Sequence, residues 1–442
     1  MKIVHLVGWY FPDSVGGTEV YVEGLCRRLR AAGHEVLIAA PDSRHAAPEH
    51  YEHEQVPVFR YAIPETVTRD EANHRLPVRG VERLYRWLAE ERADILHVHS
   101  FTTGVGLQEI REARRLGMRV IVTCHLPGLG YMCRTGELMQ GGRFPCDGIA
   151  IPDKCAACYL TRLGMPPFAA QIAAAIPPVV SAGFSRVHGR LGTALGMTAS
   201  VTEFQRLQRE LFALVERFVV LNETSRRMLV SNGSPAAKIV LNPLGLGHTD
   251  LTRKPSPDLQ PTTAPVRFGC VGRLYAAKGV LELARAAVAM PRNVAFRLDI
   301  RGPQNDEASR SYAAVLRTVI GDDPRVTMGP AVAGHDVPAL LAGYDVLVCP
   351  SIGFENGPTI ALEAMAVGTP IIASRVGNLA EIVDDGKNGQ LVAPGRIDDW
   401  SRALTDAALN PAAIDRWRRA LCPQRTMDDV AADYLSIYGT RN

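Results

Sequence analysis

Two stretches of the chain repeat one alternation of short apolar runs and longer amphipathic segments. Residues 2–8 form an apolar run that leads into a glycine-containing loop, and an amphipathic segment follows from Thr18 to Ala32. Gly33 is a natural stop for this predicted helix, because glycine accepts the left-handed backbone that ends many helices. Short apolar runs bounded by turns are typical of buried strands. Further strands are predicted at residues 36–39, 94–99 and 119–123.

The same order of strands and helices begins again near residue 266. Val266 to Val271 is a predicted strand, and a helix is predicted from about Gly279 to Met290. Between the two stretches, Leu251 to Pro265 holds four prolines, a composition typical of a linker. Alternating strands and helices favour parallel sheets covered by helices. Later strands are predicted at residues 296–300, 326–328, 345–349 and 370–373.

Length and composition agree with two globular domains. The chain has 442 residues, too many for one hydrophobic core, and its 47% apolar and 21% charged residues are ordinary for globular proteins. A formal net charge of +3 without long runs of like charge argues against nucleic acid as a partner. The first residues resemble a strand rather than a secretion signal, and no apolar stretch suits a spanning helix, so we expect a cytoplasmic protein.

The most informative segment runs from Pro350 to Pro370. A predicted strand ends just before it, and Pro358 suits the first position of a helix, where a missing N–H costs little. The start of such a helix directs free amides and the positive end of its dipole at a bound phosphate. Glu355 lies in the loop and Glu363 lies five residues after Pro358, so two carboxylates can contact different hydroxylated groups. Helix capping and a surface position are the alternative interpretation.

Two cations follow the first strand of the second stretch. Arg273 and Lys278 lie five residues apart on a strand-to-helix loop, so both can reach one diphosphate, arginine as a planar fork and lysine as a point charge. They would stabilise the negative charge that grows on a leaving phosphate. The chain has only six lysines, which draws attention to Lys278. A solvated loop is the alternative interpretation.

Candidate residues also lie at strand ends of the first stretch. Gly16 and Gly17 occupy the first strand-to-helix turn, where glycines let a backbone approach a ligand closely. His125 follows a predicted strand, at the sheet edge where ligands bind, although a single histidine is often structural. His97 and His99, near another strand end, are more readily explained as structural. No Gly-x-Gly-x-x-Gly motif occurs at the first turn, which argues against an NAD-dependent dehydrogenase.

Together these segments resemble retaining glycosyltransferases of family 4, whose α/β fold has two Rossmann-like domains facing a cleft (GT-B). The resemblance covers nearly the whole chain. Its most specific marks are the spacing of Glu355 and Glu363, the run from Leu362 to Ala366, and the Gly-Arg and Lys-Gly pairs around Arg273 and Lys278. It implies an acceptor domain at residues 1–250 with an insertion at about 126–200, a linker at 251–265, a donor domain at 266–424, and a C-terminal helix at 425–442 that rejoins the first domain.

The resemblance also implies an activity and a set of roles. The enzyme would move a sugar from a nucleotide-diphosphate sugar to a hydroxyl of a glycan, a lipid-linked sugar or a small molecule. Arg273 and Lys278 would bind the diphosphate, Glu363 would hold the ribose, and Glu355 would contact the donor sugar. With His125 near the transferred sugar, the catalytic set is Glu355, His125, Arg273 and Lys278. Backbone near the sugar and phosphates would come from Gly16, Gly17, Gly357, Pro358 and Thr359.

Two positions depart from the pattern of the family. Asn378 occupies the place of a second glycine, and Asn242 to Gly245 replaces the more usual Pro-Asn-Gly. No Asp-x-Asp pair occurs, so we expect no cofactor to be required for catalysis, and we expect a front-face transfer with retention. A double displacement is the alternative mechanism. A sugar-nucleotide epimerase or hydrolase of the same fold and a non-catalytic nucleotide-sugar binding protein are the alternative functions.

The insertion carries two further features. Cys133, Cys146, Cys155 and Cys158 fall within 26 residues, and the last two have the spacing of a metal knuckle. A structural zinc, disulfides and free thiols all stay open, and elemental analysis of protein purified without added metal would distinguish zinc. Residues 160–200 hold arginines and no acidic residue, which suits an extra helical pair or a basic apolar face on a membrane or lipid-linked acceptor. In the second case the protein would lie peripherally on the inner face of the membrane.

Overall fold

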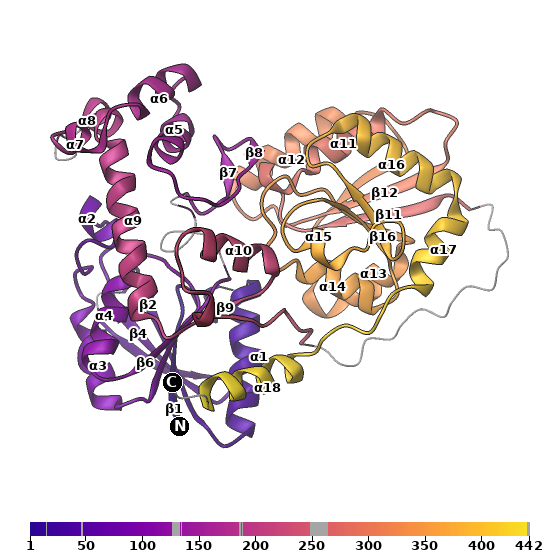
Figure 1. Ribbon diagram of the computed structural model, residues 1–442. Helices are drawn as coiled ribbons and strands as arrows, with labels where there is room; N and C mark the ends of the chain where they lie inside the picture. Colours follow the sequence, from indigo (N-terminus) through magenta and orange to yellow (C-terminus); the bar gives the residue numbers. More distant parts are fainter. Residues whose placement is uncertain are drawn as a thin grey trace. The chain divides into compact units, whose positions relative to one another are not determined.

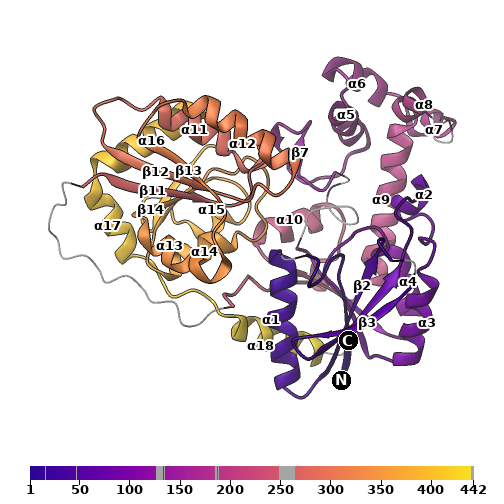
Figure 2. The same cartoon turned by 180° about the vertical axis from the view of Figure 1, so that it is seen from behind.

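The computed structural model describes residues 1–14, 16–45, 47–125, 133, 135–184, 187, 189–247 and 264–439. The chain divides into two compact units, residues 1–247 with 427–442 and residues 248–426. Each unit is built on its own sheet with helices packed against it (Figure 1), and Figure 2 shows the same elements from behind. Almost all of the predicted linker at 251–265 lies outside the described residues.

The first unit holds an eight-stranded sheet in the order β10-β9-β6-β5-β1-β2-β4-β3. Every neighbouring pair is parallel except β3 and β4. β1 lies between β2 and β5, so the strand order changes direction at β1, the position where parallel sheets bind ligands. The strands are β1 (Lys2–Leu6), β2 (Glu35–Asp42), β3 (Glu49–His53), β4 (Val56–Ala62), β5 (Ile95–Val98), β6 (Arg119–Thr123), β9 (Arg217–Val220) and β10 (Ile239–Leu241).

The last helix of the chain belongs to the first unit. The Tyr21 hydroxyl of α1 donates to the Tyr434 hydroxyl of α18 at 3.1 Å, and Arg28 pairs with Asp428 at 2.5 Å. Tyr434 is fully buried, so α18 contributes to the core of this unit. The helices around this sheet are α1 (Gly17–Ala31), α2 (Arg69–Ala72), α3 (Glu82–Glu91), α4 (Leu107–Arg115), α10 (Glu223–Ser231), the 3-10 turn η1 (Ala236–Lys238) and α18 (Met427–Gly439).

The insertion is larger than the predicted helical pair. A hairpin of β7 (Met139–Gln140) and β8 (Phe144–Pro145) precedes four short helices and one long one. Alanines dominate the small core between these helices, which lets their backbones approach closely. Prolines stand at the start of three of them, where proline is favoured. The helices are α5 (Pro152–Arg162), α6 (Pro167–Ala174), α7 (Pro178–Ala182), α8 (Gly189–Leu195) and α9 (Met197–Leu214).

The second unit holds a six-stranded parallel sheet in the order β13-β12-β11-β14-β15-β16. Counted within this unit, the order is 3-2-1-4-5-6, that of the Rossmann fold. The strand order therefore switches between β11 and β14. The strands are β11 (Val266–Val271), β12 (Phe296–Arg301), β13 (Val326–Gly329), β14 (Val346–Cys349), β15 (Ile371–Ser374) and β16 (Gly389–Val392).

Both faces of the second sheet are covered by helices. Along β14, Val346 and Val348 join one core cluster and Leu347 and Cys349 join another, as expected for a strand whose side chains alternate between faces. The first cluster includes α11 (Val280–Val288), α12 (Glu307–Ile320), α16 (Ile397–Leu409) and α17 (Pro411–Arg419). The second includes α13 (Val337–Gly343), α14 (Thr359–Ala366) and α15 (Leu379–Ile382). The 3-10 turns η2 (Ala276–Lys278) and η3 (Gly334–Asp336) lie in loops.

The predicted α/β fold with two parallel sheets is confirmed. Within the described residues, no helix has both the length and the apolar character that crossing a bilayer requires.

Candidate active site

The loops after β11 and β14 form a pocket in the second unit. These strands are neighbours at the switch in strand order, so the segments that follow them leave the same edge of the sheet side by side. The pocket has a volume of about 220 Å³. Most of the residues predicted in this unit for phosphate and sugar binding line it: Arg273, Lys278, Glu355, Gly357, Pro358 and Thr359.

Lys278 and Glu355 pair with each other in this pocket. The Nζ atom of Lys278 donates to Oε1 of Glu355 at 2.6 Å, and the Ser351 hydroxyl donates to the same oxygen at 2.5 Å. The Glu355 side chain is only 12% exposed. Burial acts to lower the pKa of Lys278, but the Glu355 carboxylate outweighs burial and the pKa is raised. Lys278 is therefore a charged group, and a bound diphosphate would replace Glu355 as its counter-ion.

A glycine holds the two pocket loops together. Gly279 has a φ of +67°, and a Cβ atom at this position would lie 2.0 Å from the carbonyl oxygen of Pro350. The N–H of Ile352 donates to the carbonyl oxygen of Ala277 at 2.8 Å. Only glycine allows both the left-handed backbone and this close approach. The loop that carries Lys278 is thereby fixed against the loop after β14.

Arginines add positive charge to the pocket wall. Arg273 is exposed, and its guanidinium carbon lies 5.3 Å from the centroid of the Tyr275 ring. Arg301, at the end of β12, also lines the pocket, although the sequence analysis missed it. Its Nε atom donates to the Asp299 carboxylate at 2.9 Å. Arg301 aligns with Val271 across two neighbouring strands and so lies at the same sheet edge, a register that the structure gives and the sequence alone does not.

Helix α14 begins at the pocket. Its first residue is Thr359, and Pro358 is the N-cap rather than the first helical residue as predicted. Glu363 is absent from the pocket lining but lies four residues after Thr359, on the same face of the helix. Burial raises the pKa of Glu363 to about 7. Glu363 can therefore bind a polar group of a ligand that extends beyond the pocket along α14.

Asn378, which stands where the family usually has a second glycine, causes no backbone strain. Asn378 has φ −66° and ψ −25°, an ordinary helical conformation that does not need glycine. Its N–H donates to the carbonyl oxygen of Glu355 at 2.7 Å. Gly377 is the position that requires glycine, since its φ is +48° and a Cβ atom would lie 2.2 Å from the same carbonyl oxygen. The second departure, at Asn242, is also accommodated, because its side chain donates to the Val430 carbonyl oxygen of α18 at 3.3 Å.

In the first unit, the predicted glycine pair lies at the start of α1. Gly17 is its first residue, and apart from its two chain neighbours no heavy atom of the described residues lies within 4 Å of a Cβ atom built there. A Cβ atom at Gly16 would lie 2.7 Å from Oε2 of Glu19, whose carboxylate accepts a hydrogen bond from Ser14 at 2.6 Å. The turn is therefore open at Gly17 and closed by a buried acidic side chain at Gly16.

His125 lies after β6 and is 8% exposed. Its Nε2 atom lies 3.1 Å from Nδ1 of His99, and its ring packs edge-on against Tyr21 with 4.7 Å between centroids. Burial lowers the pKa of His125 to about 3, so the ring is neutral. His97 has a structural role, because its two ring nitrogens are hydrogen-bonded to the hydroxyls of Tyr438 and Thr123, both at 2.7 Å.

The four cysteines of the insertion are half-buried free thiols, which leaves no disulfide among them. The N–H of Gly141, at the turn of the hairpin, donates to Sγ of Cys158 at 3.2 Å. Asp147 pairs with Lys154 at 2.6 Å, which brings the chain next to Cys146 against the chain next to Cys155. No three of the four Sγ atoms lie within 4.8 Å of one another, however. A zinc ion held by Cys133, Cys146, Cys155 and Cys158 therefore stays a prediction from spacing.

Comparisons with known proteins identify the family of the chain. The family model described as glycosyl transferases group 1 matches residues 265–410, and the glycosyl transferase 4-like domain matches residues 16–150. A D-inositol 3-phosphate glycosyltransferase of Pseudarthrobacter chlorophenolicus is 34% identical over 156 residues, which cover 34% of this chain and 36% of the relative. An uncharacterized glycosyltransferase of Methanocaldococcus jannaschii is 31% identical over 38% of this chain and 43% of the relative. The chain thus spans about two fifths of the length of these relatives.

Solved structures match over nearly the whole chain. Sucrose-phosphate synthase from Thermosynechococcus elongatus has a TM-score of 0.66 at 18% identity, covering 99% of this chain and 98% of that one. The Anabaena protein HepE, solved in complex with UDP-glucose, has a TM-score of 0.62 at 14% identity, covering 99% and 100%. Fold and site together define a glycosyltransferase with the GT-B fold. The chain belongs to the group 1, GT4-like glycosyltransferases.

Proposed function

We propose that this protein transfers a sugar from a nucleotide-diphosphate sugar to an acceptor hydroxyl with retention of anomeric configuration. The observation that carries the proposal is the pocket of the second unit, where Arg273, Lys278 and the start of α14 converge on one space. Cations and helix amides of this kind stabilise a diphosphate. The solved complexes of HepE with UDP-glucose and of an Arabidopsis starch synthase with ADP support a nucleotide-linked donor.

Each pocket residue has a separate role in the proposed reaction. Arg273 and Lys278 neutralise the diphosphate as the bond between the anomeric carbon and the phosphate oxygen breaks. The acceptor oxygen forms the new bond from the same face of the sugar, and its proton passes to the departing phosphate. Glu355, released from Lys278 by the diphosphate, accepts hydrogen bonds from the donor sugar. Glu363 holds the ribose hydroxyls, while the acceptor binds the first unit.

An acceptor-dependent assay tests this proposal. A thermal-shift screen with UDP, GDP, ADP and their sugars first identifies the base, because a ligand that binds the folded state raises the melting temperature. The donor that stabilises the protein is then incubated with and without candidate acceptors, with Glu355→Ala as the control variant. We expect consumption of the donor only with an acceptor and only in the wild type. Donor converted without an acceptor to an epimer or free sugar would point to an epimerase or hydrolase, and binding without conversion to a non-catalytic protein.

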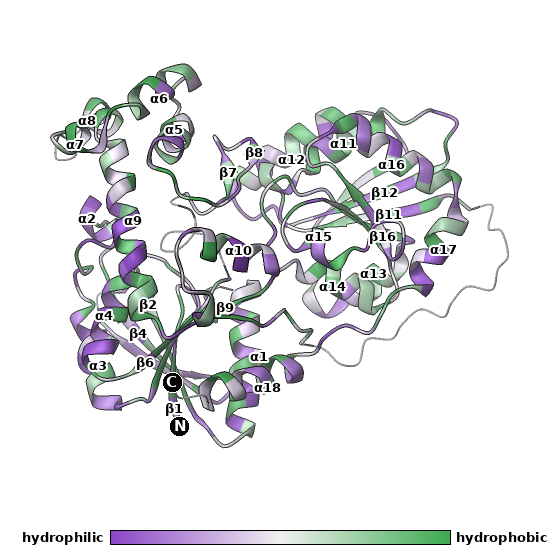
Figure 3. Cartoon of the chain, in the orientation of Figure 1, coloured by the Kyte–Doolittle hydropathy of each residue, from purple (hydrophilic) through white to green (hydrophobic). Residues whose placement is uncertain are grey.

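We propose that the helical insertion contacts an anionic membrane that carries the acceptor. Nine of the nineteen large apolar side chains exposed in the described residues lie between residues 151 and 191. Phe168, Ile172 and Leu191 are 68%, 70% and 71% exposed, and Figure 3 shows α6 and α8 coloured largely as hydrophobic. Residues 160–200 hold arginines and no acidic residue, and apolar side chains in such a setting are suited to the interface of an anionic bilayer.

Acidic substitutions on α6 should release the protein from vesicles. Phe168→Asp with Ile172→Asp is expected to weaken co-sedimentation with phosphatidylglycerol vesicles by about tenfold or more, because two apolar side chains that would enter the bilayer are lost and two negative charges, which the anionic lipid repels, are added. Val315→Asp is the matched control, since Val315 is a 48% exposed apolar residue of the second unit. Equal sedimentation of the wild type and the double variant would contradict membrane contact through α6.

A further inference from the structure

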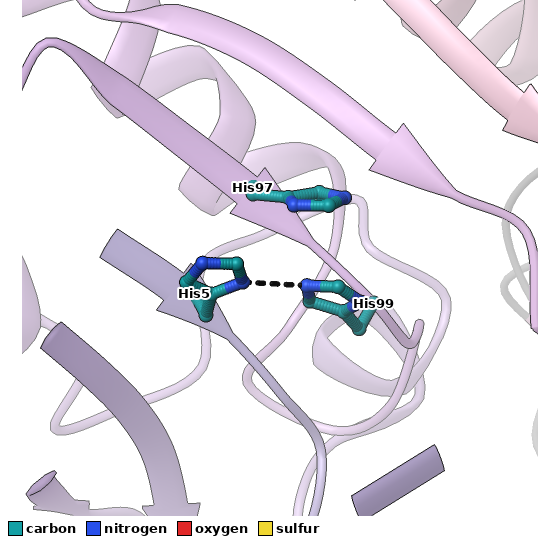
Figure 4. A group of neighbouring side chains, drawn as sticks. All are labelled: His5, His97 and His99. Atoms are coloured by element: carbon teal, nitrogen blue, oxygen red, sulfur yellow. Dashed lines mark hydrogen bonds between the residues drawn. The ribbon is translucent and has the colours of Figure 1, made fainter. Parts of the chain in front are cut away.

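A row of buried histidines runs across the carboxyl edge of the first sheet. His5 lies on β1, His99 directly follows β5, and His125 follows β6, three strands that are neighbours in the sheet. Nδ1 of His5 lies 2.8 Å from Nε2 of His99, and Nδ1 of His99 lies 3.1 Å from Nε2 of His125. Figure 4 shows the first of these contacts, with one ring nitrogen of His5 directed at one ring nitrogen of His99. The row therefore ends at the histidine predicted to lie near the transferred sugar.

All three rings are neutral. Burial lowers the pKa of His5 and of His125 to about 3, and burial together with the neighbouring histidines lowers the pKa of His99 far below its usual value. A neutral imidazole has one N–H and one acceptor nitrogen. Each contact in the row needs one donor, so the protons must all be arranged in the same direction, from His5 to His125 or from His125 to His5.

The far nitrogen of His5 decides the direction. Nε2 of His5 is buried, and no hydrogen-bond partner for it exists within the described residues. If the row ran from His125 to His5, this nitrogen would carry a buried N–H without an acceptor, which proteins avoid more strictly than an unused acceptor. If each histidine donates toward His125, Nε2 of His5 carries no proton and only its lone pair is unused. The second arrangement is the less costly one.

We propose that His5 and His99 are positioning residues that hold His125 in the tautomer protonated on Nδ1. The N–H of His5 donates to His99, and the N–H of His99 donates to Nε2 of His125, which leaves the proton of His125 on Nδ1. In this tautomer the Nε2 lone pair of His125 is occupied by His99 and its Nδ1 atom carries the proton, so His125 acts on the donor as a neutral ring and not as a general base. This role for His125 rests on the proposed function, whereas the direction of the row does not.

A metal ion is the alternative occupant. One nitrogen each from His5, His97 and His99 lies within 4.8 Å of the others, the arrangement that a metal would need. Both nitrogens of His97 are already bonded to hydroxyls, however, and His5 and His99 bond to each other. Because each histidine offers one nitrogen, a metal would have to displace one of the two hydroxyls from His97 and would compete with the contact between His5 and His99, so the hydrogen-bonded row is the better account of the geometry.

Nitrogen NMR of the full chain labelled with ¹⁵N-histidine tests the proposal. Long-range ¹H–¹⁵N correlations, assigned with His125→Gln, should show the wild-type ring of His125 protonated on Nδ1. His5→Leu removes the first donor and should shift His125 toward the Nε2-protonated form, whereas His5→Asn keeps a donor near the position of Nδ1 and should restore the wild-type pattern. We expect a KM for the donor about tenfold higher in His5→Leu, recovered in His5→Asn.

Two results would overturn the proposal. One is a wild-type His125 protonated on Nε2, and the other is displacement of the His5, His97 and His99 signals by one equivalent of Zn²⁺. The spectrum also separates this proposal from the proposed function. If His125 is protonated on Nδ1 but the protein transfers no sugar, the proposed hydrogen-bonded row is supported and the proposed transferase function is refuted.

Discussion

Lys278→Ala is expected to lower the turnover of sugar transfer by about 10³-fold at saturating donor. Lys278 is the cation that would meet the charge developing on the leaving diphosphate, and removing one such group from an enclosed site costs on this order. The loss should appear mainly in kcat, because the interaction strengthens as the phosphate departs. Initial rates with the donor found in the nucleotide screen provide the measurement. Lys387→Ala is the control, since this lysine is 72% exposed and pairs with Asp384.

A loss of folding must be distinguished from a loss of chemistry in this variant. Removing Lys278 leaves the Glu355 carboxylate, 12% exposed, without its ion pair, which should destabilise the protein by about 1–3 kcal/mol. Adding Glu355→Gln removes the uncompensated charge and should recover most of that stability. Turnover should stay low in the double variant. Turnover of Lys278→Ala within tenfold of the wild type would exclude the proposed role of this lysine.

The sequence predicted the residues of the donor pocket better than it predicted their partners. Arg273, Lys278 and Glu355 stand on loops after β11 and β14, and parallel topology alone brings such loops to one sheet edge. The ion pair between Lys278 and Glu355, 77 residues apart, depends on how two loops fold against each other. A glycine contact that no periodicity reveals sets that arrangement, the approach of Gly279 to Pro350. Arg301 was missed because its place beside Val271 becomes visible only with strand register.

The central strands of both sheets were predictable, and so was the edge strand β13, whereas β3, β4, β9 and β10 of the first sheet and β16 of the second were not. β1, β5, β6, β11 and β14 are mostly apolar, because both faces of a parallel sheet are buried. β3 reads Glu-His-Tyr-Glu-His and lies at the sheet edge, so it lacks the apolar signal. The histidine row shows another limit. His5, His99 and His125 are far apart in sequence, and each is unremarkable until the order of β1, β5 and β6 places them side by side.

Glu363 should make the stability of the free protein depend on pH. Its pKa is raised from 4.5 to about 7 in the folded protein, so the stability from its protonated form is fully present below about pH 4.5 and is lost as the pH rises through 7. Glu363→Gln cannot ionise and should therefore be more stable than the wild type at pH 8, by about 1–3 kcal/mol, with little difference at pH 4.5. Denaturant unfolding at the two pH values measures this difference.

Nucleotide binding should respond to Glu363→Gln in the opposite sense. A carboxylate that accepts hydrogen bonds from ribose hydroxyls contributes about 1.5–3 kcal/mol, so the variant should bind the nucleotide about 10- to 100-fold more weakly at pH 8. Glu109→Gln is the matched control, because burial also raises the pKa of Glu109 to about 7 in the first unit. That control should gain stability at pH 8 without losing affinity. Burial of an ionised carboxylate destabilises the free protein, and hydrogen bonds to a bound ligand would offset that cost. A Glu363→Gln variant that is more stable than the wild type and binds the nucleotide equally tightly would therefore show that Glu363 does not contact the donor.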